Sequence, residues 1–236
     1  MAVGVRGHRR RRVALGVGVP VVLVLALAQV LLPGLAAKRV SARVARYGTV
    51  KSVHVSAWPA IELLWGKADS VDLRVGSFTA TPAQMVAQLW EARGVNDMTV
   101  SVDTATFSES ALPRGLTIGN LRTTKHGTAI HTSATFTQSQ LDAALPSGVQ
   151  IEPTASGGGE VEAHVSGGLF GLQASISALV RPVDGRLIAE PRGLPFGGLA
   201  TITLFEDPHL KINAVGITVS SRSPLTYRLS LTASLT

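Results

Sequence analysis

The chain contains no cysteine among its 236 residues. This absence excludes disulfide bonds, cysteine metal ligands, thiol nucleophiles and a membrane anchor made by lipidation of a cysteine. It leaves the cellular compartment open, because an exported protein can fold without disulfide bonds.

Charged residues are also few, at 16% of the chain, against 45% hydrophobic residues. The net charge of +7 overstates the basic character, because five arginines precede residue 13. The rest of the chain holds 17 basic and 15 acidic residues, a balance of only +2. A nucleic-acid-binding surface therefore has little support, and we expect no nucleic-acid partner.

The short motifs of common catalytic sites are missing as well. The sequence has no G-x-S-x-G, no H-E-x-x-H, no P-loop and no G-x-G-x-x-G after a strand. The densest group of acidic and imidazole side chains is Glu206, Asp207 and His209, which we interpret as a polar turn rather than a metal site. We therefore predict a protein that is not an enzyme and has no catalytic residue, metal or cofactor.

An uncharged apolar run occupies residues 13–32, directly behind the arginines of residues 9–12. As a helix with a rise of about 1.5 Å per residue, it would span a hydrocarbon core of roughly 30 Å. We assign residues 1–12 to a basic cytoplasmic n-region and residues 13–34 to a membrane segment that places the following domain outside the cytoplasm. Two interpretations stay open: a signal anchor that remains in the cell membrane, or a signal peptide cleaved after Ala28 to release a periplasmic protein.

Residues 35–236 combine many short strands with a few short helices. Alternation of apolar and polar residues predicts strands over residues 53–58, 71–75, 98–102, 116–125, 128–136, 161–165, 172–180, 186–189, 210–219 and 225–235. Apolar spacing and N-terminal caps predict helices over residues 36–47, 59–65, 82–92 and 137–145. We therefore predict a single α+β domain with a mostly antiparallel sheet.

Residues 53–75 are the stretch around which the chain is organised, and their sequence is VHVSAWPAIELLWGKADSVDLRV. It predicts a strand, a short helix that starts after Pro59 and ends at Gly66, and a second strand. Ile61, Leu64 and Trp65 fall on one face of that helix at α-helical spacing. A helix this short is not stable alone in water, so it must lie against a sheet or a lipid.

Several features together resemble the LmeA-like phospholipid-binding family of actinobacterial cell-envelope proteins. They are the apolar N-terminus followed by a basic helix, the block at residues 53–75, FTQSQLDAAL at residues 136–145 and VDGRLIAEP at residues 183–191. The resemblance covers roughly residues 35–236. It implies a curved, mostly antiparallel sheet wrapped around short helices, similar to half of a tubular lipid-binding (TULIP-like) fold.

The resemblance also implies a function without catalytic residues. The protein is expected to bind phospholipid at the outer face of the cytoplasmic membrane, in support of envelope lipid or lipoglycan biogenesis or of lipid transfer. The expected partner is a phospholipid or a membrane surface, and the sequence does not identify any envelope biosynthesis protein as a partner.

Large apolar side chains on two predicted helices and one strand form the candidate lipid-binding site, because an apolar pocket with little polar lining suits an acyl chain. The candidate residues are Trp58, Ile61, Leu64, Trp65, Met85, Leu89, Trp90, Leu172 and Ile176. A second interpretation stays open, in which these side chains close a packed core on each other. The protein would then be a structural or scaffolding protein of the envelope with no lipid cavity.

Overall fold

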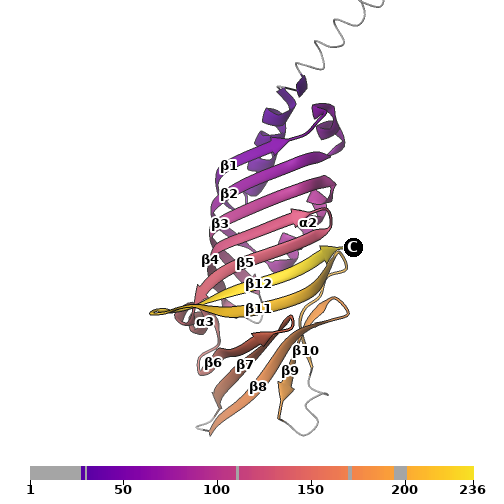
Figure 1. Cartoon of the computed structure of the whole chain (residues 1–236). Helices are drawn as coiled ribbons and strands as arrows, with labels where there is room; N and C mark the ends of the chain where they lie inside the picture. Colours follow the sequence, from indigo (N-terminus) through magenta and orange to yellow (C-terminus); the bar gives the residue numbers. More distant parts are fainter. Residues whose placement is uncertain (1–27, 30, 110–111, 170–171, 194–200) are drawn as a thin grey trace, which may run out of the picture.

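The computed structural model describes residues 28–29, 31–109, 112–169, 172–193 and 201–236. These residues form two open β-sheets with a few short helices (Figure 1). The expected α+β class with mostly antiparallel strands is confirmed. Residues 1–12 and most of residues 13–34 lie outside the described residues, and no helix of the described part is long and apolar enough to cross a bilayer.

The larger sheet has seven strands in the order β1-β2-β3-β4-β5-β12-β11. Their bounds are β1 (Gly48–Ser56), β2 (Ala68–Ala80), β3 (Val95–Glu109), β4 (Leu112–His126), β5 (Ala129–Thr137), β11 (Leu210–Arg222) and β12 (Leu225–Leu235). Neighbouring strands are antiparallel except β2 and β3, which are parallel. A parallel pair needs a long crossover, and α2 (Pro82–Glu91) with the short 3-10 helix η2 (Ala92–Gly94) supplies it.

A second sheet of five antiparallel strands has the order β10-β9-β8-β7-β6. Its strands are β6 (Val149–Gly157), β7 (Glu160–Leu169), β8 (Leu172–Val183), β9 (Arg186–Arg192) and β10 (Ile202–Phe205). The sequence predicts one sheet, whereas the structure divides the strands between two. The reason is that β5 already pairs with β4 on one side and β12 on the other, so the chain leaves the larger sheet through α3 (Gln138–Ala144) before β6 begins.

The two sheets meet where hairpin turns of the second sheet contact β11, the edge strand of the first. The N–H groups of Ile212 and Val215 donate to the carbonyl oxygens of Gly185 and Gly159, at 2.8 and 2.9 Å. The N–H of Ile217 donates to Ser156 Oγ at 2.9 Å. Gly159 and Gly185 have φ of +86° and +81°, and a Cβ on Gly185 would lie 2.8 Å from the Lys211 side chain. Both turns therefore need glycine to approach β11 this closely.

The N-terminal caps predicted for the helices over residues 82–92 and 137–145 are confirmed, and both caps form capping boxes. Thr81 Oγ1 accepts from the Gln84 N–H at 3.2 Å, and Gln84 Oε1 accepts from the Thr81 N–H at 2.9 Å, at the start of α2. Thr137 and Gln140 make the same pair of bonds at the start of α3, at 3.2 and 2.8 Å. Each box satisfies two backbone donors that the first helical turn would leave unpaired.

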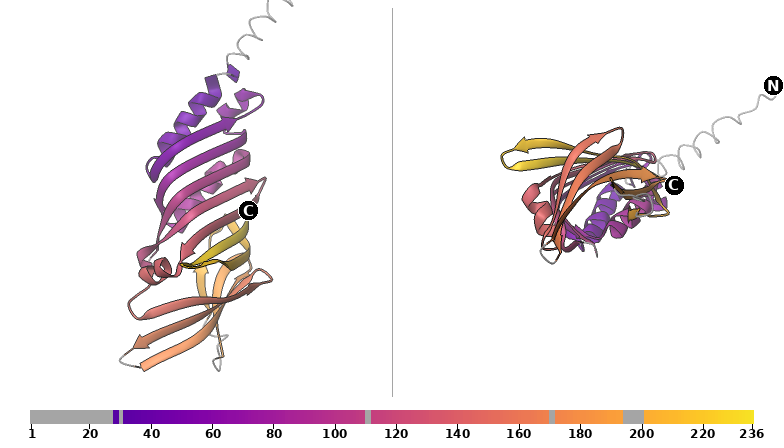
Figure 2. Two further views of the ribbon diagram at one scale, coloured as in Figure 1. Left: turned by 60° about the vertical axis from the view of Figure 1, so that its left-hand side comes forward. Right: turned by 90° about the horizontal axis from the view of Figure 1, so that it is seen from below.

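Helices lie on one face of the larger sheet, which we call the inner face (Figure 2). The helix over residues 31–44 packs Ala36 and Ala37 against the cluster of Val55, Val71 and Met98, and its Val44 against the central cluster of the sheet. The 3-10 helix η1 (Ala60–Trp65) and α2 pack against the same end of the face, through Leu63 and Leu89. The apolar side chains of β1 to β3 therefore point toward these helices.

Candidate functional site

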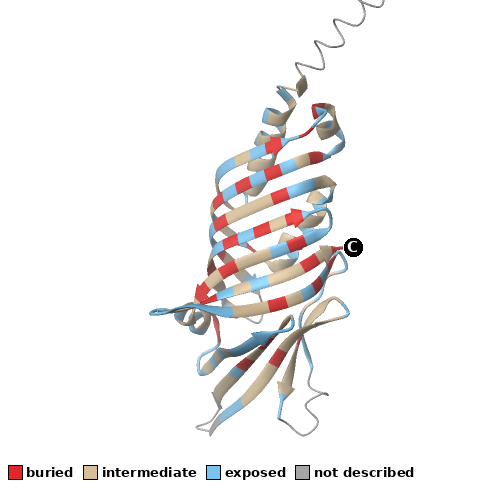
Figure 3. Ribbon diagram, in the orientation of Figure 1, coloured by how far each residue is buried: buried red, intermediate tan, exposed pale blue. Residues whose placement is uncertain are grey.

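The inner face of the larger sheet is apolar, and the opposite face is polar. Buried or half-buried residues alternate with exposed ones along much of the larger sheet (Figure 3). On β12, for example, Tyr227 is buried, Leu229 is half-buried, and Arg228 and Ser230 are exposed. The centre of the inner face is one cluster of buried side chains, formed by Leu73, Val75, Val102, Ala105, Ile118, Leu121, Ala134, Phe136 and Tyr227.

Large apolar side chains around this cluster are only half-buried. They include Phe107, Leu116, Ile217, Leu225 and Leu229, which pack against the cluster and keep part of their surface exposed. An acyl chain bound on such a surface would lose contact with water along much of its length. Each methylene group removed from water contributes about 0.8 kcal/mol to the free energy of binding. The arrangement of helices and sheet can therefore bind an apolar chain.

The four predicted site residues around η1 do not share one environment. Trp58, Leu64 and Trp65 are exposed, by 76%, 63% and 69%, while Ile61 is half-buried. The predicted apolar face assumed α-helical spacing, but η1 is a 3-10 helix with about three residues per turn. Residues three apart therefore share a face, and the structure turns Ala60 and Leu63 toward the protein.

The predicted site residues of α2 lie against the inner face. Leu89 and Trp90 pack on buried Val86, in a cluster completed by Ile130, Leu210, Ala233 and Leu235. Leu89 also contacts the cluster on which Leu63 of η1 packs, whereas Met85 is half-buried. The Trp90 ring lies 4.4 Å from the His209 ring, centroid to centroid. α2 therefore joins the ends of several strands through packed side chains.

The last two predicted site residues belong to the second sheet. Ile176 is half-buried on β8, and Leu172 begins that strand, although its side chain lies outside the described ones. The structure thus brings η1 and α2 to one cluster through Leu63 and Leu89, and places Ile176 on a different sheet.

Leu64 and Ile130 provide a direct test of this placement. We expect Leu64→Ala to change the free energy of unfolding by less than about 0.5 kcal/mol, because the side chain is exposed. Ile130→Ala should cost about 2–5 kcal/mol, because Ile130 is only 2% exposed in the α2 cluster. Urea unfolding of the three proteins measures both values. A cost for Leu64→Ala close to that of Ile130→Ala would place Leu64 in the core instead.

Lys125 is a buried cation on the inner face that the sequence pattern did not single out. The residue is 2% exposed, and its Nζ donates to the Val95 carbonyl oxygen. Burial lowers the pKa of the ammonium below its ordinary value, and the charge of Asp97 offsets part of that shift. A lysine in an alternating strand is expected to be exposed, and only its spacing from buried Leu121 and Thr123, on the same face of β4, could have indicated otherwise.

The lowered pKa of Lys125 predicts an unusual pH dependence. Between the lowered folded-state pKa and the ordinary value of 10.5, the unfolded chain binds more protons than the folded chain, so stability rises with pH. We expect Lys125→Met to remove this rise, as measured by urea unfolding between about pH 7 and 9.5. Tyr227 acts in the opposite direction at higher pH, because burial raises the pKa of its phenol above 10.0. A stability difference between the two proteins that does not change with pH would contradict the prediction.

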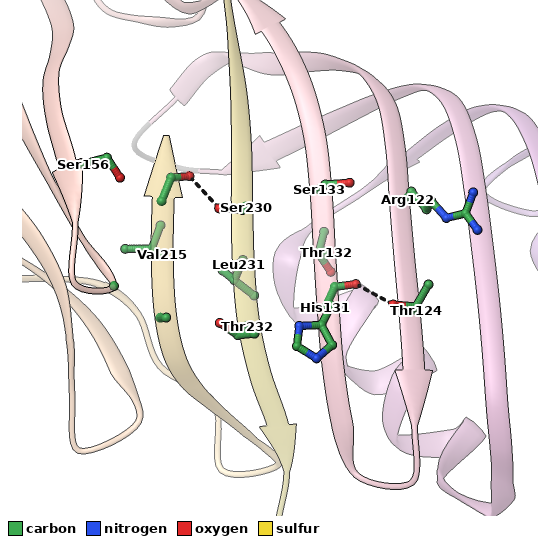
Figure 4. Close-up of a pocket in the computed structure, with 13 residues that line it drawn as sticks. Arg122, Thr124, His131, Thr132, Ser133, Ser156, Val215, Ser230, Leu231 and Thr232 are labelled. Carbon is green, nitrogen blue, oxygen red and sulfur yellow. Dashed lines mark hydrogen bonds between the residues drawn. The ribbon is translucent and has the colours of Figure 1, made fainter. Parts of the chain in front are cut away.

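A hollow of about 540 Å³ lies on the polar face, where the turn between β6 and β7 meets β11 (Figure 4). Its hydroxyls are partly used by the backbone: Ser230 Oγ donates to the Gly216 carbonyl at 3.2 Å, and Ser156 Oγ accepts from Ile217. Arg122 and His131 also line the hollow and are exposed. Removing these polar groups from water would oppose binding of an acyl chain, so this hollow is not the lipid-tail site.

The turn that holds Glu206, Asp207 and His209 connects β10 to β11. Asp207 Oδ1 accepts from the His209 N–H at 2.8 Å and lies 3.4 Å from His209 Nδ1. Over residues 28–236, apart from the gaps given above, no three histidine, aspartate or glutamate side chains are grouped to hold a metal ion. Because the His209 ring also contacts Trp90, the turn ties the start of β11 to α2.

Comparison with known proteins adds no relative to this description. No family model, no curated protein and no solved structure matches the chain. The resemblance to the LmeA-like family stays a prediction from the sequence, and function must be argued from the geometry of the chain itself.

Proposed function

We propose that this chain is a non-catalytic phospholipid-binding protein at the outer face of the cytoplasmic membrane. An acyl chain lies against the inner face of the larger sheet, and the sheet with its helices corresponds to one half of a TULIP-like fold. The protein supports envelope lipid or lipoglycan biogenesis, or transfers lipid. The observation that carries this proposal is the apolar inner face, whose outer ring of large side chains is only half-buried.

The polarity of the two faces supports the same proposal. The helices lie on the apolar face alone, as Ala36, Leu63 and Leu89 show by packing on one cluster there. The other face carries exposed polar residues such as Arg122, His131 and Ser230. One face of the sheet is polar and exposed to solvent, and the other is apolar and partly covered by helices. An acyl chain can therefore bind on one side only.

The location that we propose follows from the N-terminal sequence. Arginines at residues 9–12 precede the uncharged run of residues 13–32, which favours an N-in single-pass anchor with residues 35–236 outside the cytoplasm. Cleavage of the run would instead release the domain to the periplasm. In either case an alkaline phosphatase fused to the C-terminus should be active, and an inactive fusion beside an active cytoplasmic reporter would contradict the location.

A second candidate function is that of an envelope scaffold whose inner face closes on itself. The packing of Val86, Leu89 and Trp90 of α2 against strand residues favours it, because these side chains already fill one end of the face. Such a protein would carry no acyl chain, and its function would lie in its outer surface.

Copurified lipid separates the two functions. The full chain is purified in detergent, and its bound phospholipid is quantified by mass spectrometry after extraction. Residues 1–34 fused to an unrelated soluble domain serve as the control for lipid held by the membrane segment. Phospholipid in excess of that control supports lipid binding by the domain, and equal amounts support the scaffold.

A further inference from the structure

Large apolar side chains gather in the open at the end of the protein where the described chain begins. Trp58, Leu64 and Trp65 on and beside η1 are exposed by 76%, 63% and 69%. Leu31 and Leu35 in the first turns of the neighbouring helix are exposed by 59% and 55%. We call these five residues the apolar tip. Soluble surfaces seldom group large apolar side chains in this way unless something covers them.

Hydrogen bonds hold the two parts of the tip together. Gln29 Nε2 donates to the Ala57 carbonyl at 3.1 Å, and Gln29 Oε1 accepts from the Ala60 N–H at 2.7 Å. The same side chain therefore satisfies backbone groups on both sides of Pro59, where η1 begins. Because Gln29 is two residues before Leu31, these bonds bring the start of the helix beside η1.

The tip lies where the apolar N-terminal run enters the domain. Residues 13–32 carry no charge and are long enough for a bilayer-spanning helix, and this run includes both Gln29 and Leu31. A membrane segment that ended here would leave Trp58 and Trp65 at the level of the headgroups. Tryptophan is enriched at that level, because its ring is apolar and its indole N–H can still reach water or a headgroup.

Basic side chains follow the tip on both parts of the chain. Lys38 and Arg39 are exposed on the helix after Leu35, and Lys67 is exposed after Gly66, the C-cap of η1. None of the three forms an ion pair with a residue that the structure describes. An anionic membrane surface would complement these free charges within a Debye length.

We propose that the apolar tip inserts into the headgroup layer of an anionic bilayer and holds the domain with η1 against the membrane. The occupant of the tip is the bilayer surface rather than a second copy of the chain. The spanning-length run leads into the tip, and three basic residues with no ion pair among the described residues follow it in the chain. This inference rests on the proposed function and adds to it the orientation of the domain: the end of the larger sheet that carries η1 faces the lipid.

Tryptophan quenching in vesicles tests the orientation. The full chain is reconstituted into vesicles of phosphatidylcholine and phosphatidylglycerol whose acyl chains carry bromine. The wild type is compared with the Trp58→Phe, Trp65→Phe double variant, whose remaining emission comes from Trp90. Both replaced side chains are exposed, so the variant should fold, and its circular dichroism verifies this.

We expect brominated lipid to quench the wild-type emission about twofold more than that of the variant, because only Trp58 and Trp65 reach the bilayer. Equal quenching of the two proteins would overturn the proposal. Lower quenching in vesicles without phosphatidylglycerol supports the binding of anionic headgroups by the basic residues. Identical quenching in the two kinds of vesicle would overturn that binding. The alternative is that two chains cover the tip of each other. Cross-linking of two chains in the vesicle, together with no quenching of Trp58 and Trp65, would assign the tip to a second copy and overturn the proposal.

The outcome is separable from that of lipid binding by the inner face. Leu229 lies on β12, far along the sheet order from β1 and η1. A Leu229→Glu protein should lose its carried lipid and keep the wild-type quenching. Wild-type amounts of lipid in that variant would count against the proposed function alone, and loss of quenching in it would count against the tip.

Discussion

Leu229→Glu is expected to remove the copurified phospholipid from the purified protein. Leu229 lies on the inner face, half-buried, and packs against the central cluster of the larger sheet. A carboxylate there must either stay in water or be buried beside the acyl chain, and burial of an unpaired charge is strongly unfavourable. The amount of phospholipid that mass spectrometry finds in the extract should therefore fall to that of the fusion control.

Ser230→Glu is the matched control for this variant. Ser230 is the next residue on β12 and points to the polar face, where it is exposed. The Ser230→Glu substitution adds the same charge to the same strand, but on the other face, so the amount of bound lipid should stay at that of the wild type. A folded Leu229→Glu protein that carries lipid at the wild-type ratio would rule out the inner face as the binding site. If glutamate prevents folding, Leu229→Ser provides a smaller polar change, and wild-type lipid in that variant would contradict the proposal in the same way.

Tyr227→Ala should lower the free energy of unfolding by about 3–5 kcal/mol, the range for loss of a buried aromatic ring. Tyr227 is 1% exposed in the central cluster, and its ring lies 5.4 Å from that of Phe136, centroid to centroid. The variant loses the transfer energy of the ring and leaves a cavity between β5 and β12. Urea unfolding followed by circular dichroism measures the change.

Tyr227→Phe separates the ring from its hydroxyl. It keeps the aromatic packing, and we expect a cost of less than about 1.5 kcal/mol, the usual limit for a swap that conserves volume. A cost for Tyr227→Ala no greater than that of Tyr227→Phe would show that the centre of the sheet is not the core that these contacts describe.

Local signals in the sequence predicted the elements of this fold well. Thr81 with Gln84 and Thr137 with Gln140 form their capping boxes because all the partners lie within one helical turn. Alternation along residues 225–235 placed β12 for a similar reason, since each residue's face depends on its neighbours in the chain. The strands that were missed are β6, whose alternation is interrupted by Pro153, and β10, which is only four residues long.

These local signals could not predict features that depend on contacts between residues distant in the chain. The division into two sheets follows from the pairing of β5 with β12, which lies about ninety residues later in the chain. The burial of Lys125 depends on the carbonyl of Val95 on another strand. The candidate site was predicted as an apolar surface on two helices and one strand. The 3-10 spacing of η1 turns Leu64 and Trp65 outward, so the side chains that face the protein differ from those predicted.

The turns that cover β11 also limit how copies of this protein can join. A sheet grows by adding strands at a free edge, and two free edges allow an endless fibre. Over residues 212–217 the donors of β11 are already taken by Gly185, Gly159 and Ser156. The other edge of the larger sheet is β1. Two copies that paired β1 with β1 would have β11 as the outer strand at each end, and the turns on residues 212–217 would oppose the addition of a third copy there.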